Sequence, residues 1–486
     1  MRRNMFQADR YHMTQGNFSL KERLSEKLLL AEAHTRFYAS FRKLPFAPCV
    51  GHERLVEFLS HTALDAPRIR FLKNDRAGLE QIGKYLERHQ IRGVVRAVRP
   101  GTIMFPREPF ADISGHFVAV QLAEVKFEHA FDVPMTVAFR ALEMRRAAGP
   151  NRSLSVFSNR RDGDVDRSVD VSKYAYIGGF DDTSSMEAGF VLDQMTVGTM
   201  AHYLVQSYVD VEEIDGATGL RKHFQQICFE RWLDAHPNGT TLLLDTISVE
   251  LGIKHAIAAA KSSPARMKAF KFARIDTSPV GLLCQYTEKC FRQNGLHETR
   301  VMGTGDLDRN SIVKTIEECP TIAGFGVGTK LISEVENVAG VVFKECEIDG
   351  NPSVKCSSKA KSTLPGKHQV WRFSDEEGYY LFDVISTTNL NEHLIMAEFG
   401  HTAGPNASCV PLLNPFTIDG MCIDIPLPEE QRAFVAEQIP RFRDLYSYPI
   451  HLSGELKELT EKTTIHMNRD ENEYPDITMP PMPDLN

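Results

Sequence analysis

The sequence of 486 residues has no uninterrupted apolar stretch of the ~18 residues that a membrane-spanning helix needs. Its opening residues, MRRNMFQADRYHM, carry basic side chains with no apolar run behind them, which is not the pattern of a secretion signal. We therefore predict a soluble cytoplasmic protein that has no membrane partner.

The cysteines lack the spacings that are typical of metal sites, redox motifs or disulfide frameworks. The nine cysteines form no CxxC pair and no regular framework. Scattered cysteines of this kind are typical of reduced thiols inside a cell, so we do not expect a disulfide scaffold. The chain also has no internal repeat, which leaves out the repeat architectures.

The chain lacks an excess of positive charge. Its 56 Lys and Arg residues are outnumbered by 64 Asp and Glu residues, which gives a net charge of −8. Such a protein has no general attraction for nucleic acid, so a phosphate-bearing ligand must be bound by local basic groups. A small anionic metabolite fits this balance better than a nucleic acid partner.

The chain does have enough apolar material, 42% of its residues, for two or three domains. Residues 20–59 show helical periodicity, interrupted by a proline-containing link. Short extended pieces, RGVVRAV, GTIMFP and HFVAVQLAE, follow in residues 91–120. These patterns predict an α+β domain in residues 1–125.

The middle of the chain alternates between strands and helices. A helix, MTVAFRALEMRRAAG, ends at Gly149, and from Tyr174 onward apolar strand candidates are separated by helical segments. The strand candidates are AYIGGF, MTVGTM, TTLLLDTI, FKFARID, TRVMGT, AGFGVG and AGVVFKECEI. Six or seven such units in about 170 residues favour an α/β fold with an irregular, TIM-like (β/α) barrel, which we assign to residues 126–348.

The pattern changes again after the predicted barrel. Turn-rich pieces and two helices, PEEQRAFVAEQIPRFRDLY and GELKELTEK, form a C-terminal module in residues 349–467. Residues 468–486 are acidic and rich in proline, which predicts a disordered tail.

Polar residues follow the predicted barrel strands, where barrel enzymes carry their chemistry. Carboxylates at such positions are the oxygen ligands that Mg²⁺ prefers, although a single one is more often a helix cap. The polar residues at strand ends are Asp181, Asp182, Thr199, Asp245, Asp276, Asp306 and Thr329.

Residues 178–208 combine two glycine turns with a histidine. Gly198 and Thr199 follow an extended MTV, and His202 stands just inside the next helix, beside amides without intrahelical partners. A histidine there is suited to hold a phosphate or to be phosphorylated, since neutral imidazole is a nucleophile. The alternative is a structural histidine that is hydrogen-bonded beside a turn.

Two other elements suit an anionic ligand. FGVGTK, residues 325–330, ends a strand with glycines whose amides can surround a phosphate. Arg160 and Arg161 form a basic pair suited to bidentate contacts with phosphate or carboxylate. A plain tight turn and a solvated loop are the respective alternatives.

Motifs along nearly the whole chain, in the same order, resemble those of the nicotinate phosphoribosyltransferase family. DRYHMT is similar to DLYxLTM, RFYASFRKLPF to FELFFRKxPF, PGTIMFPREPF to EGTxxFPxEPL, and KYAYIGGFDDTSS to SYxYIGGFDGTSN. MTVGTMAHYLV resembles the segment with the phosphorylated histidine, RID the start of RIDSGDL, GFGVGTKLI the phosphate loop, and TLPGKHQVWR the motif TLPGxKQVYR. The resemblance implies a barrel beside a smaller α+β domain, built from the N-terminal and C-terminal segments that pack together.

The resemblance also implies roles for individual residues. His202, phosphorylated by ATP, and Asp276, which contacts the ribose hydroxyls, would be catalytic. Tyr11 and Arg274 would bind the ring and the carboxylate of nicotinate, with Thr199 beside them. The phosphoribosyl pyrophosphate would be bound by Arg160, Arg161, Gly326, Gly328 and Thr329.

The implied reaction displaces pyrophosphate from the anomeric carbon by the pyridine nitrogen, with ATP as co-substrate. Mg²⁺ is the implied cofactor, and Asp245 and Asp276 are the candidates for its ligands. The implied assembly is a homodimer in which Tyr11 reaches the partner's site.

Several residues differ from the family motifs. RIDSGDL reads RIDTSPV, with Ser278 in place of glycine and Pro279 in place of the second aspartate. DTYD reads DTIS, with Ser248 in place of an acid, SND reads TGD, and Tyr203 follows His202.

Three functions stay open at this point. The first is an active nicotinate transferase, and the second is a divergent relative that binds a phosphoribosyl ligand or another base. The third is a different barrel enzyme, such as an aldolase, which would need a strand-end lysine that no predicted strand supplies.

Overall fold

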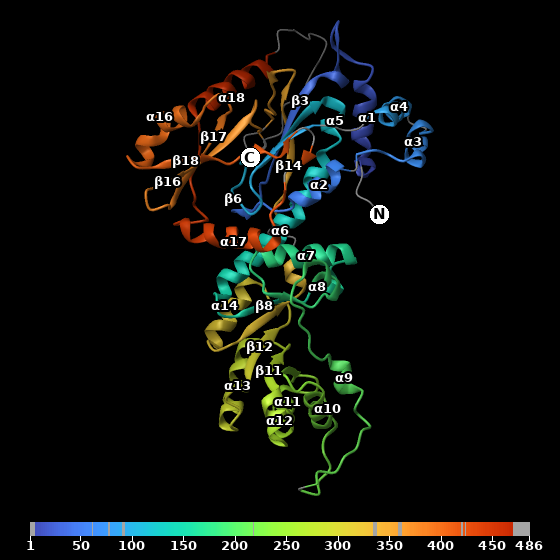
Figure 1. Ribbon diagram of the computed structural model, residues 1–486, viewed down its shortest axis with the longest axis vertical. Coiled ribbons are helices and arrows are strands. Elements are labelled where there is room, and N and C mark those ends of the chain that lie inside the picture. The colour runs from blue at the N-terminus through green and yellow to red at the C-terminus, as the bar shows by residue number, and fades with distance from the viewer. Residues whose placement is uncertain are drawn as a thin grey trace, which may run out of the picture.

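The chain folds into two parts, which Figure 1 shows one above the other. The computed structural model describes residues 5–60, 62–75, 78–89, 93–216, 218–333, 338–357, 362–418, 421–422 and 424–469. The lower part is formed by the middle of the chain, and the upper part combines N-terminal and C-terminal segments.

A six-stranded parallel sheet forms the lower part, in the order β10-β11-β12-β13-β8-β9. In this order the strands span Thr240–Leu243, Phe270–Ile275, Arg300–Thr304, Gly324–Val327, Ser153–Val156 and Asp182–Thr183. Side chains from its strands are fully buried: Leu154, Leu242, Ala273, Val301 and Phe325. The register places these side chains on one face of the sheet, which is therefore buried.

The helices of the lower part are α7 (Val165–Ile177), α8 (Met186–Leu192), α9 (His202–Gln206), α10 (Phe224–Ala235), α11 (Val249–Lys261), α12 (Pro264–Ala269), α13 (Val280–Gln293), α14 (Arg309–Glu318) and α15 (Thr329–Ile332). Several begin at a side chain that accepts a free backbone N–H: Asp164, Ser185, Ser248, Ser263 and Asp308. Such caps satisfy donors that lack an intrahelical partner, so the sequence fixes where these helices start.

An extended segment bridges the two edges of the parallel sheet. Thr196 pairs with Thr183 of β9 in a parallel bridge, and the Val197 N–H donates to the Thr183 carbonyl at 2.9 Å. On the other side the Thr199 hydroxyl donates to the carbonyl of Thr241 in β10 at 2.9 Å. The sheet therefore curls into an irregular, partial barrel, and the predicted α/β fold is confirmed.

The upper part holds an antiparallel sheet in the order β15-β14-β3-β7-β5-β19. Its strands span Asn351–Pro352, Val342–Ile348, His34–Ser40, Ala111–His116, Val94–Ala97 and Asn414–Pro415. Three two-stranded ribbons are β1-β2 (Arg23–Ser25, Leu28–Leu29), β4-β6 (Ala47–Pro48, Ile103–Met104) and β20-β21 (Thr417–Ile418, Met421–Cys422). Its helices are α1 (Arg10–Ser19), α2 (His52–Ser60), α3 (Ala66–Lys73), α4 (Glu80–Arg88) and α5 (Phe117–Gln121).

A second sheet of the upper part comes from the C-terminal segment, in the order β18-β16-β17-β22. The strands span Ser408–Pro411, His368–Ser374, Tyr380–Thr387 and Ile450–Leu452, with α16 (Glu392–Ala403), α17 (Pro428–Gln438) and α18 (Gly454–Met467). Trp371, Phe373, Phe382 and Ile395 form a separate apolar core here. The predicted helix GELKELTEK is confirmed as α18, whereas PEEQRAFVAEQIPRFRDLY is helical only as far as Gln438, followed by a 3-10 turn at Ile439–Arg441.

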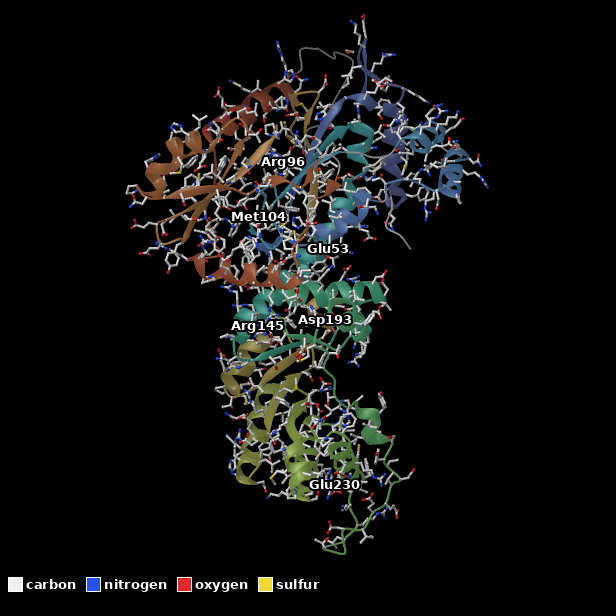
Figure 2. All side chains as sticks on the ribbon, in the orientation of Figure 1. Glu53, Arg96, Met104, Arg145, Asp193 and Glu230 are labelled. Carbon is white, nitrogen blue, oxygen red and sulfur yellow. The ribbon has the colours of Figure 1, made fainter. Side chains whose placement is uncertain are left out.

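Helix α6, Glu124–Ala148, connects the two parts. It contacts α2, β4 and β14 above and α7 and α14 below. Arg145, which Figure 2 labels near the junction, donates to the Gly179 carbonyl and to the Asp181 carboxylate, both within 2.7 Å. A Cβ at Gly178 would lie 2.5 Å from the Ala138 carbonyl oxygen, so only glycine lets this turn approach α6.

Three predictions of local structure are wrong. Residues 20–41, predicted as helical, contain β1, β2 and β3. AYIGGF, predicted as a strand, is the end of α7 and the turn after it, and HFVAVQLAE contains α5. Strand β8, which opens the parallel sheet, is not among the predicted strands.

The division of the chain into domains is more interwoven than the sequence suggests. Residues 342–348, at the end of the predicted barrel segment, form β14, which pairs with β3 of the upper part. The predicted limits at residues 125, 348 and 467 stay predictions, and residues 470–486 of the predicted tail lie outside the described residues. Within the described part, no helix combines the length and apolar character needed to cross a membrane.

Candidate active site

A row of residues crosses the parallel sheet at its carboxyl edge, where barrel enzymes carry their chemistry. Thr304, Gly326, Ser155 and Asp182 are register partners on four neighbouring strands. Asp245 and Asp276 continue the row two residues beyond the paired Leu243 and Arg274. We call these six residues the edge row: Asp245, Asp276, Thr304, Gly326, Ser155 and Asp182.

Hydrogen bonds fix the two carboxylates on β10 and β11. The Thr304 hydroxyl donates to Asp276 Oδ1 at 2.6 Å. Asp245 Oδ2 accepts from the Asp276 backbone N–H at 2.8 Å and from the Thr277 hydroxyl at 2.6 Å. Asp245 Oδ1 is buried and has no hydrogen-bond partner within the described structure. One carboxylate oxygen therefore has unused hydrogen-bonding capacity.

Arg274 lies two residues before Asp276, on the same face of β11. Its Nη2 lies 3.5 Å from Asp276 Oδ2, and its Nε is buried without a hydrogen-bond partner in the described ranges. Burial lowers the pKa of the Arg274 guanidinium, and nearby Arg160 lowers it as well, whereas Asp276 and Asp245 raise it. Guanidinium stays protonated in proteins, so the site holds a cation suited to a carboxylate ligand.

His202 begins α9 and faces the same carboxylates. Its Nδ1 lies 3.1 Å from the Thr246 hydroxyl, and its Nε2 lies 3.9 Å from Asp276 Oδ2. The side chain is 41% exposed, which leaves it open to a reacting group. The structure thus brings together four residues that the sequence singled out from distant segments: Asp245, Arg274, Asp276 and His202.

Phe157 covers the glycine of the edge row and was not found from the sequence. Its N–H donates to the Val327 carbonyl at 2.7 Å, and a Cβ at Gly326 would lie 2.4 Å from its ring. A Cβ at Gly328 would lie 3.1 Å from the Phe157 carbonyl oxygen. The predicted phosphate-loop glycines therefore make room for Phe157, and its half-buried ring offers an aromatic surface at the carboxyl edge.

The other predicted anion-binding residues lie after the central strands of the same sheet. Arg160 and Arg161 are exposed in a 3-10 turn, Asn159–Arg161, that follows β8. Thr329 begins α15, directly after β13. Thr199 lies before α9, and its hydroxyl is used to hold the bridging segment on β10.

Tyr11 does not join this cluster within one chain. It lies on α1 in the upper part, whereas α9 and the parallel sheet lie in the lower part (Figure 1). Its hydroxyl donates to Glu124 Oε2 at 2.7 Å, and its ring stacks on His12. Burial raises the pKa of Tyr11, and the hydrogen bond to Glu124 raises it further. The residue is still 45% exposed, so its ring is open to a partner.

The carboxylates of Asp245 and Asp276 fit a Mg²⁺ ion that is bound together with a phosphorylated substrate. The described residues contain no group of three or more His, Cys, Asp or Glu that would hold a metal by itself. Mg²⁺ in such sites takes one or two carboxylates and completes its shell with substrate phosphates and water. The buried, unpartnered Oδ1 of Asp245 suits that arrangement.

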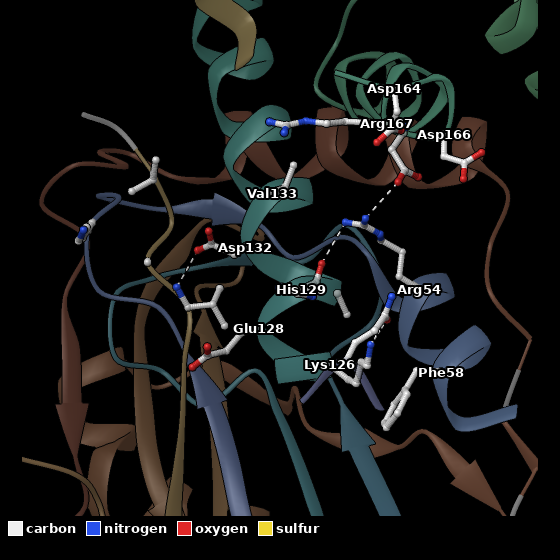
Figure 3. A pocket seen from close by; sticks show the side chains of 17 residues that line it. Arg54, Phe58, Lys126, Glu128, His129, Asp132, Val133, Asp164, Asp166 and Arg167 are labelled. Atoms are coloured by element: carbon white, nitrogen blue, oxygen red, sulfur yellow. Dashed lines mark hydrogen bonds and ion pairs between the residues drawn. The ribbon is translucent and has the colours of Figure 1, made fainter. Parts of the chain in front are cut away.

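A cavity of about 760 Å³ lies elsewhere, between the upper part and α7 (Figure 3). Some of its charged side chains already have partners: Arg54 Nη2 lies 3.2 Å from Asp170 Oδ2, and Asp132 Oδ1 accepts from the Val341 backbone N–H at 2.9 Å. The residues that line it do not include the edge row. We therefore place the candidate active site at the edge row and not in this cavity.

Comparison with known proteins finds relatives that share one name. No family model matches the chain. A nicotinate phosphoribosyltransferase of Mycobacterium tuberculosis is 28% identical over 477 residues, which is 94% of this chain and 94% of that one. Relatives of the same name from Arabidopsis thaliana (27% over 400 residues, 72% of this chain and 71% of that one) and Bacillus subtilis (26% over 382 residues, 75% and 74%) also match. Over nearly its whole length the chain is thus similar to nicotinate phosphoribosyltransferases.

Two solved structures share the fold of this chain. Human nicotinic acid phosphoribosyltransferase superposes with a TM-score of 0.76 at 22% identity, over 93% of this chain and 99% of that one. A nicotinate-nucleotide pyrophosphorylase from Pyrococcus furiosus gives 0.68 at 20% identity, over 90% and 95%. At these identities the likeness shows the fold.

Three positions that the sequence singled out as departures, Ser248, Pro279 and Tyr203, lie in different surroundings. Ser248 caps α11, since its hydroxyl accepts the Leu251 N–H at 3.2 Å. Pro279 is the N-cap of α13 and supplies no capping hydrogen bond from its side chain. Tyr203 is 75% exposed on α9. The serine therefore replaces an acid with another capping residue, whereas the proline leaves a helix end without a cap.

Proposed function

We propose that the protein is a nicotinate phosphoribosyltransferase of NAD biosynthesis. It joins nicotinate to the phosphoribosyl group of phosphoribosyl pyrophosphate, forming nicotinate mononucleotide and pyrophosphate. The observation that carries this proposal is the cluster of Arg274, Asp276 and His202 at the carboxyl edge, in a chain that matches a nicotinate phosphoribosyltransferase over 94% of its length.

The edge row suits a reaction that builds positive charge on a sugar. As the bond from the anomeric carbon to pyrophosphate breaks and the bond to the pyridine nitrogen forms, the ribose gains cationic character. Asp276 is already fixed by Thr304, so its negative charge stabilises that state without reorganisation. Arg274 binds the carboxylate of nicotinate, and the Phe157 ring lies against the pyridine ring.

The phosphates are bound by basic and backbone groups that follow β8 and β13. Arg160 and Arg161 contact the phosphates, and the turn at Gly326, Gly328 and Thr329 holds the 5-phosphate. Mg²⁺, when bound, supplies positive charge that stabilises the leaving pyrophosphate, and Asp245 with Asp276 would hold it.

His202 is the proposed site of phosphorylation by ATP. With Nδ1–H donating to the Thr246 hydroxyl, Nε2 keeps its lone pair. Nε2 attacks the γ-phosphorus, so that an N–P bond forms while the bond to the ADP oxygen breaks.

The proposal includes a homodimer in the cytoplasm. Large apolar side chains are exposed on α8 and the turn after it, and they support an interface with a second copy: Met186 (73%), Phe190 (85%), Val191 (55%) and Met195 (70%). Tyr11 of one subunit then reaches the edge row of the other. The eight described cysteines are free thiols, which fits a reducing compartment.

Product analysis with nicotinate, phosphoribosyl pyrophosphate and Mg²⁺, with and without ATP, tests the function. We expect nicotinate mononucleotide and pyrophosphate in equal amounts, with faster turnover in ATP and a phosphoryl adduct in the intact mass. Arg274→Ala should lower kcat/KM for nicotinate about 100-fold, because a charge-assisted contact is lost. His202→Ala should lose the adduct and the ATP stimulation while it keeps basal turnover.

Arg300→Ala serves as the matched control, because Arg300 is an exposed strand arginine at the amino end of β12. It should leave kcat/KM unchanged. Absence of nicotinate mononucleotide under every condition would contradict the proposed function, and an unmodified mass under turnover conditions would contradict the role of His202.

A further inference from the structure

The turn that carries Arg160 and Arg161 is closed by two buried side chains. Ser158 and Asp162 lie directly before and after the exposed residues 159–161, and they are 0% and 1% exposed. The Ser158 hydroxyl donates to Asp162 Oδ2 at 3.1 Å, and the Arg161 backbone N–H donates to the Ser158 carbonyl at 2.6 Å. A side-chain bond and a backbone bond therefore hold the same short turn. We call the hydrogen bond between Ser158 and Asp162 the clasp.

The neighbouring helices fix the rest of the turn. The Ser168 hydroxyl, which is buried on α7, donates to Asn159 Oδ1 at 2.6 Å and lies 3.2 Å from the Ser185 hydroxyl, the N-cap of α8. Two residues after the clasp, the Asp164 side chain caps the start of α7. The chain is therefore anchored beside the turn and directly after it, and only the arginine side chains face solvent freely.

Arg160 lies close to the cation of the candidate active site. Burial lowers the pKa of the Arg274 guanidinium, and the positive charge of Arg160 lowers it further because the two side chains are near each other. Like charges repel, so a loosely held turn would let Arg160 move away from Arg274. A turn that is fixed at both ends opposes this movement. An anionic ligand at the carboxyl edge can then contact both cations at once.

Stability alone does not explain the clasp. Asp162 Oδ1 is buried and has no hydrogen-bond partner in the described part of the chain. Burial raises the pKa of Asp162 more than the hydrogen bond from Ser158 lowers it. A buried polar atom without a partner destabilises the folded protein, whereas apolar groups in place of both partners of a buried hydrogen bond are often nearly neutral. The pair is therefore better explained by the geometry that it gives to the turn.

We propose that Ser158 and Asp162 are positioning residues for phosphoribosyl pyrophosphate: the clasp holds Arg160 and Arg161 where the phosphates bind. The arginines contact the ligand, and the clasp acts only through them. Since the phosphates are contacted both before and during the reaction, loss of the clasp should raise KM for phosphoribosyl pyrophosphate and leave kcat unchanged. The inference rests on the proposed function, which assigns the phosphates to these arginines.

The test compares the wild type with a clasp variant, Ser158→Ala with Asp162→Ala, which removes both partners of the hydrogen bond. We expect KM for phosphoribosyl pyrophosphate to rise about tenfold, with kcat and KM for nicotinate unchanged. Tm should stay within about 2 °C of the wild type, whereas a merely structural role would lower Tm and kcat together. Asp162→Asn keeps an oxygen that accepts from Ser158, so its KM should stay within about twofold of the wild type.

A mutant cycle shows whether the clasp acts through the arginines. In a protein that lacks both of them, Arg160→Ala with Arg161→Ala, the two clasp changes should not raise KM for phosphoribosyl pyrophosphate any further. Ser447→Ala with Asp444→Ala is the matched control, because the Ser447 hydroxyl donates to the Asp444 carboxylate in an exposed turn of the upper part. It removes the same kind of hydrogen bond and should leave all kinetic constants unchanged.

Calorimetry with phosphoribosyl pyrophosphate gives Kd for the same proteins without turnover. Unchanged KM and Kd in the clasp variant, or an equal rise with and without the two arginines, would overturn the inference while the transferase function stands. If Kd follows the cycle but no protein forms mononucleotide, the role of the clasp is supported and the proposed function is wrong.

Discussion

At the scale of single residues, Gly305 controls the position of Asp276. Its φ is +99°, and a Cβ there would lie 2.8 Å from the Asp276 carbonyl oxygen and 3.3 Å from Oδ1. An added methyl group would therefore move Asp276 relative to Thr304, which donates to it, and Arg274, which lies 3.5 Å from it. Glycine at this turn therefore allows the positive φ and also leaves room for Asp276.

We expect Gly305→Ala to lower kcat/KM at least tenfold, and to lower the free energy of unfolding by about 1 kcal/mol because alanine disfavours a positive φ. Gly295→Ala is the matched control: Gly295 has a φ of +81° and open space around it, so it should lose similar stability without losing activity. Steady-state kinetics and denaturant unfolding measure the two effects. Equal kcat/KM in both variants would refute the role of Gly305.

Some site residues could be predicted from the sequence because a local pattern indicates them, and others could not. Asp245 and Asp276 end apolar runs, and the end of a buried strand is visible in a sequence. Phe157 was not found, because a phenylalanine after an apolar run looks like a core residue until Gly326 is known to lie beside it. That Oδ1 of Asp182 lacks a partner follows from the register of β8 and β9, which no local pattern contains.

At the scale of elements, strand pairing between distant segments explains why the sequence patterns predicted the wrong secondary structure for residues 34–40. Residues 34–40 lie in a stretch with helical periodicity, yet they form β3. They do so because β7 and β14 satisfy the backbone on both sides, and β14 comes from the far side of the barrel segment. Strand formation depends on such neighbours more than on intrinsic preference, so the pattern of one segment could not show it.

The loop between β11 and α13 offers a prediction at this scale. Pro279 caps α13 without a side-chain hydrogen bond, whereas an aspartate there would accept a backbone N–H and add a carboxylate three residues after Asp276. We expect the double variant Ser278→Gly, Pro279→Asp to raise the free energy of unfolding by about 1 kcal/mol and to lower KM for phosphoribosyl pyrophosphate about tenfold. Ser278→Gly alone lacks the carboxylate and should show neither gain. If the two variants bind phosphoribosyl pyrophosphate equally, the missing acid is not what weakens this site.

At the scale of the whole molecule, one subunit does not bring all the predicted substrate-binding residues together. Tyr11 lies on α1 in the upper part, and the edge row lies in the lower part (Figure 1). Helix α8, which follows β9 in the chain, exposes apolar side chains that the proposed second copy would cover. A two-fold dimer would then pair α1 of each subunit with the edge row of the other.

Mixing two defective variants tests this shared site. Tyr11→Ala and Arg274→Ala should each be nearly inactive as homodimers, but a heterodimer contains one site with both residues intact. Co-expression in equal amounts should therefore restore about 25% of wild-type activity, since half of the dimers are mixed and each has one working site. Asp276→Asn with Arg274→Ala is the control: both changes fall in the same cluster, so every mixed site keeps one defect and the activity should stay at the level of the single variants. Light scattering that shows only monomer at micromolar concentration, or verified heterodimers without recovered activity, would contradict a site built from two subunits.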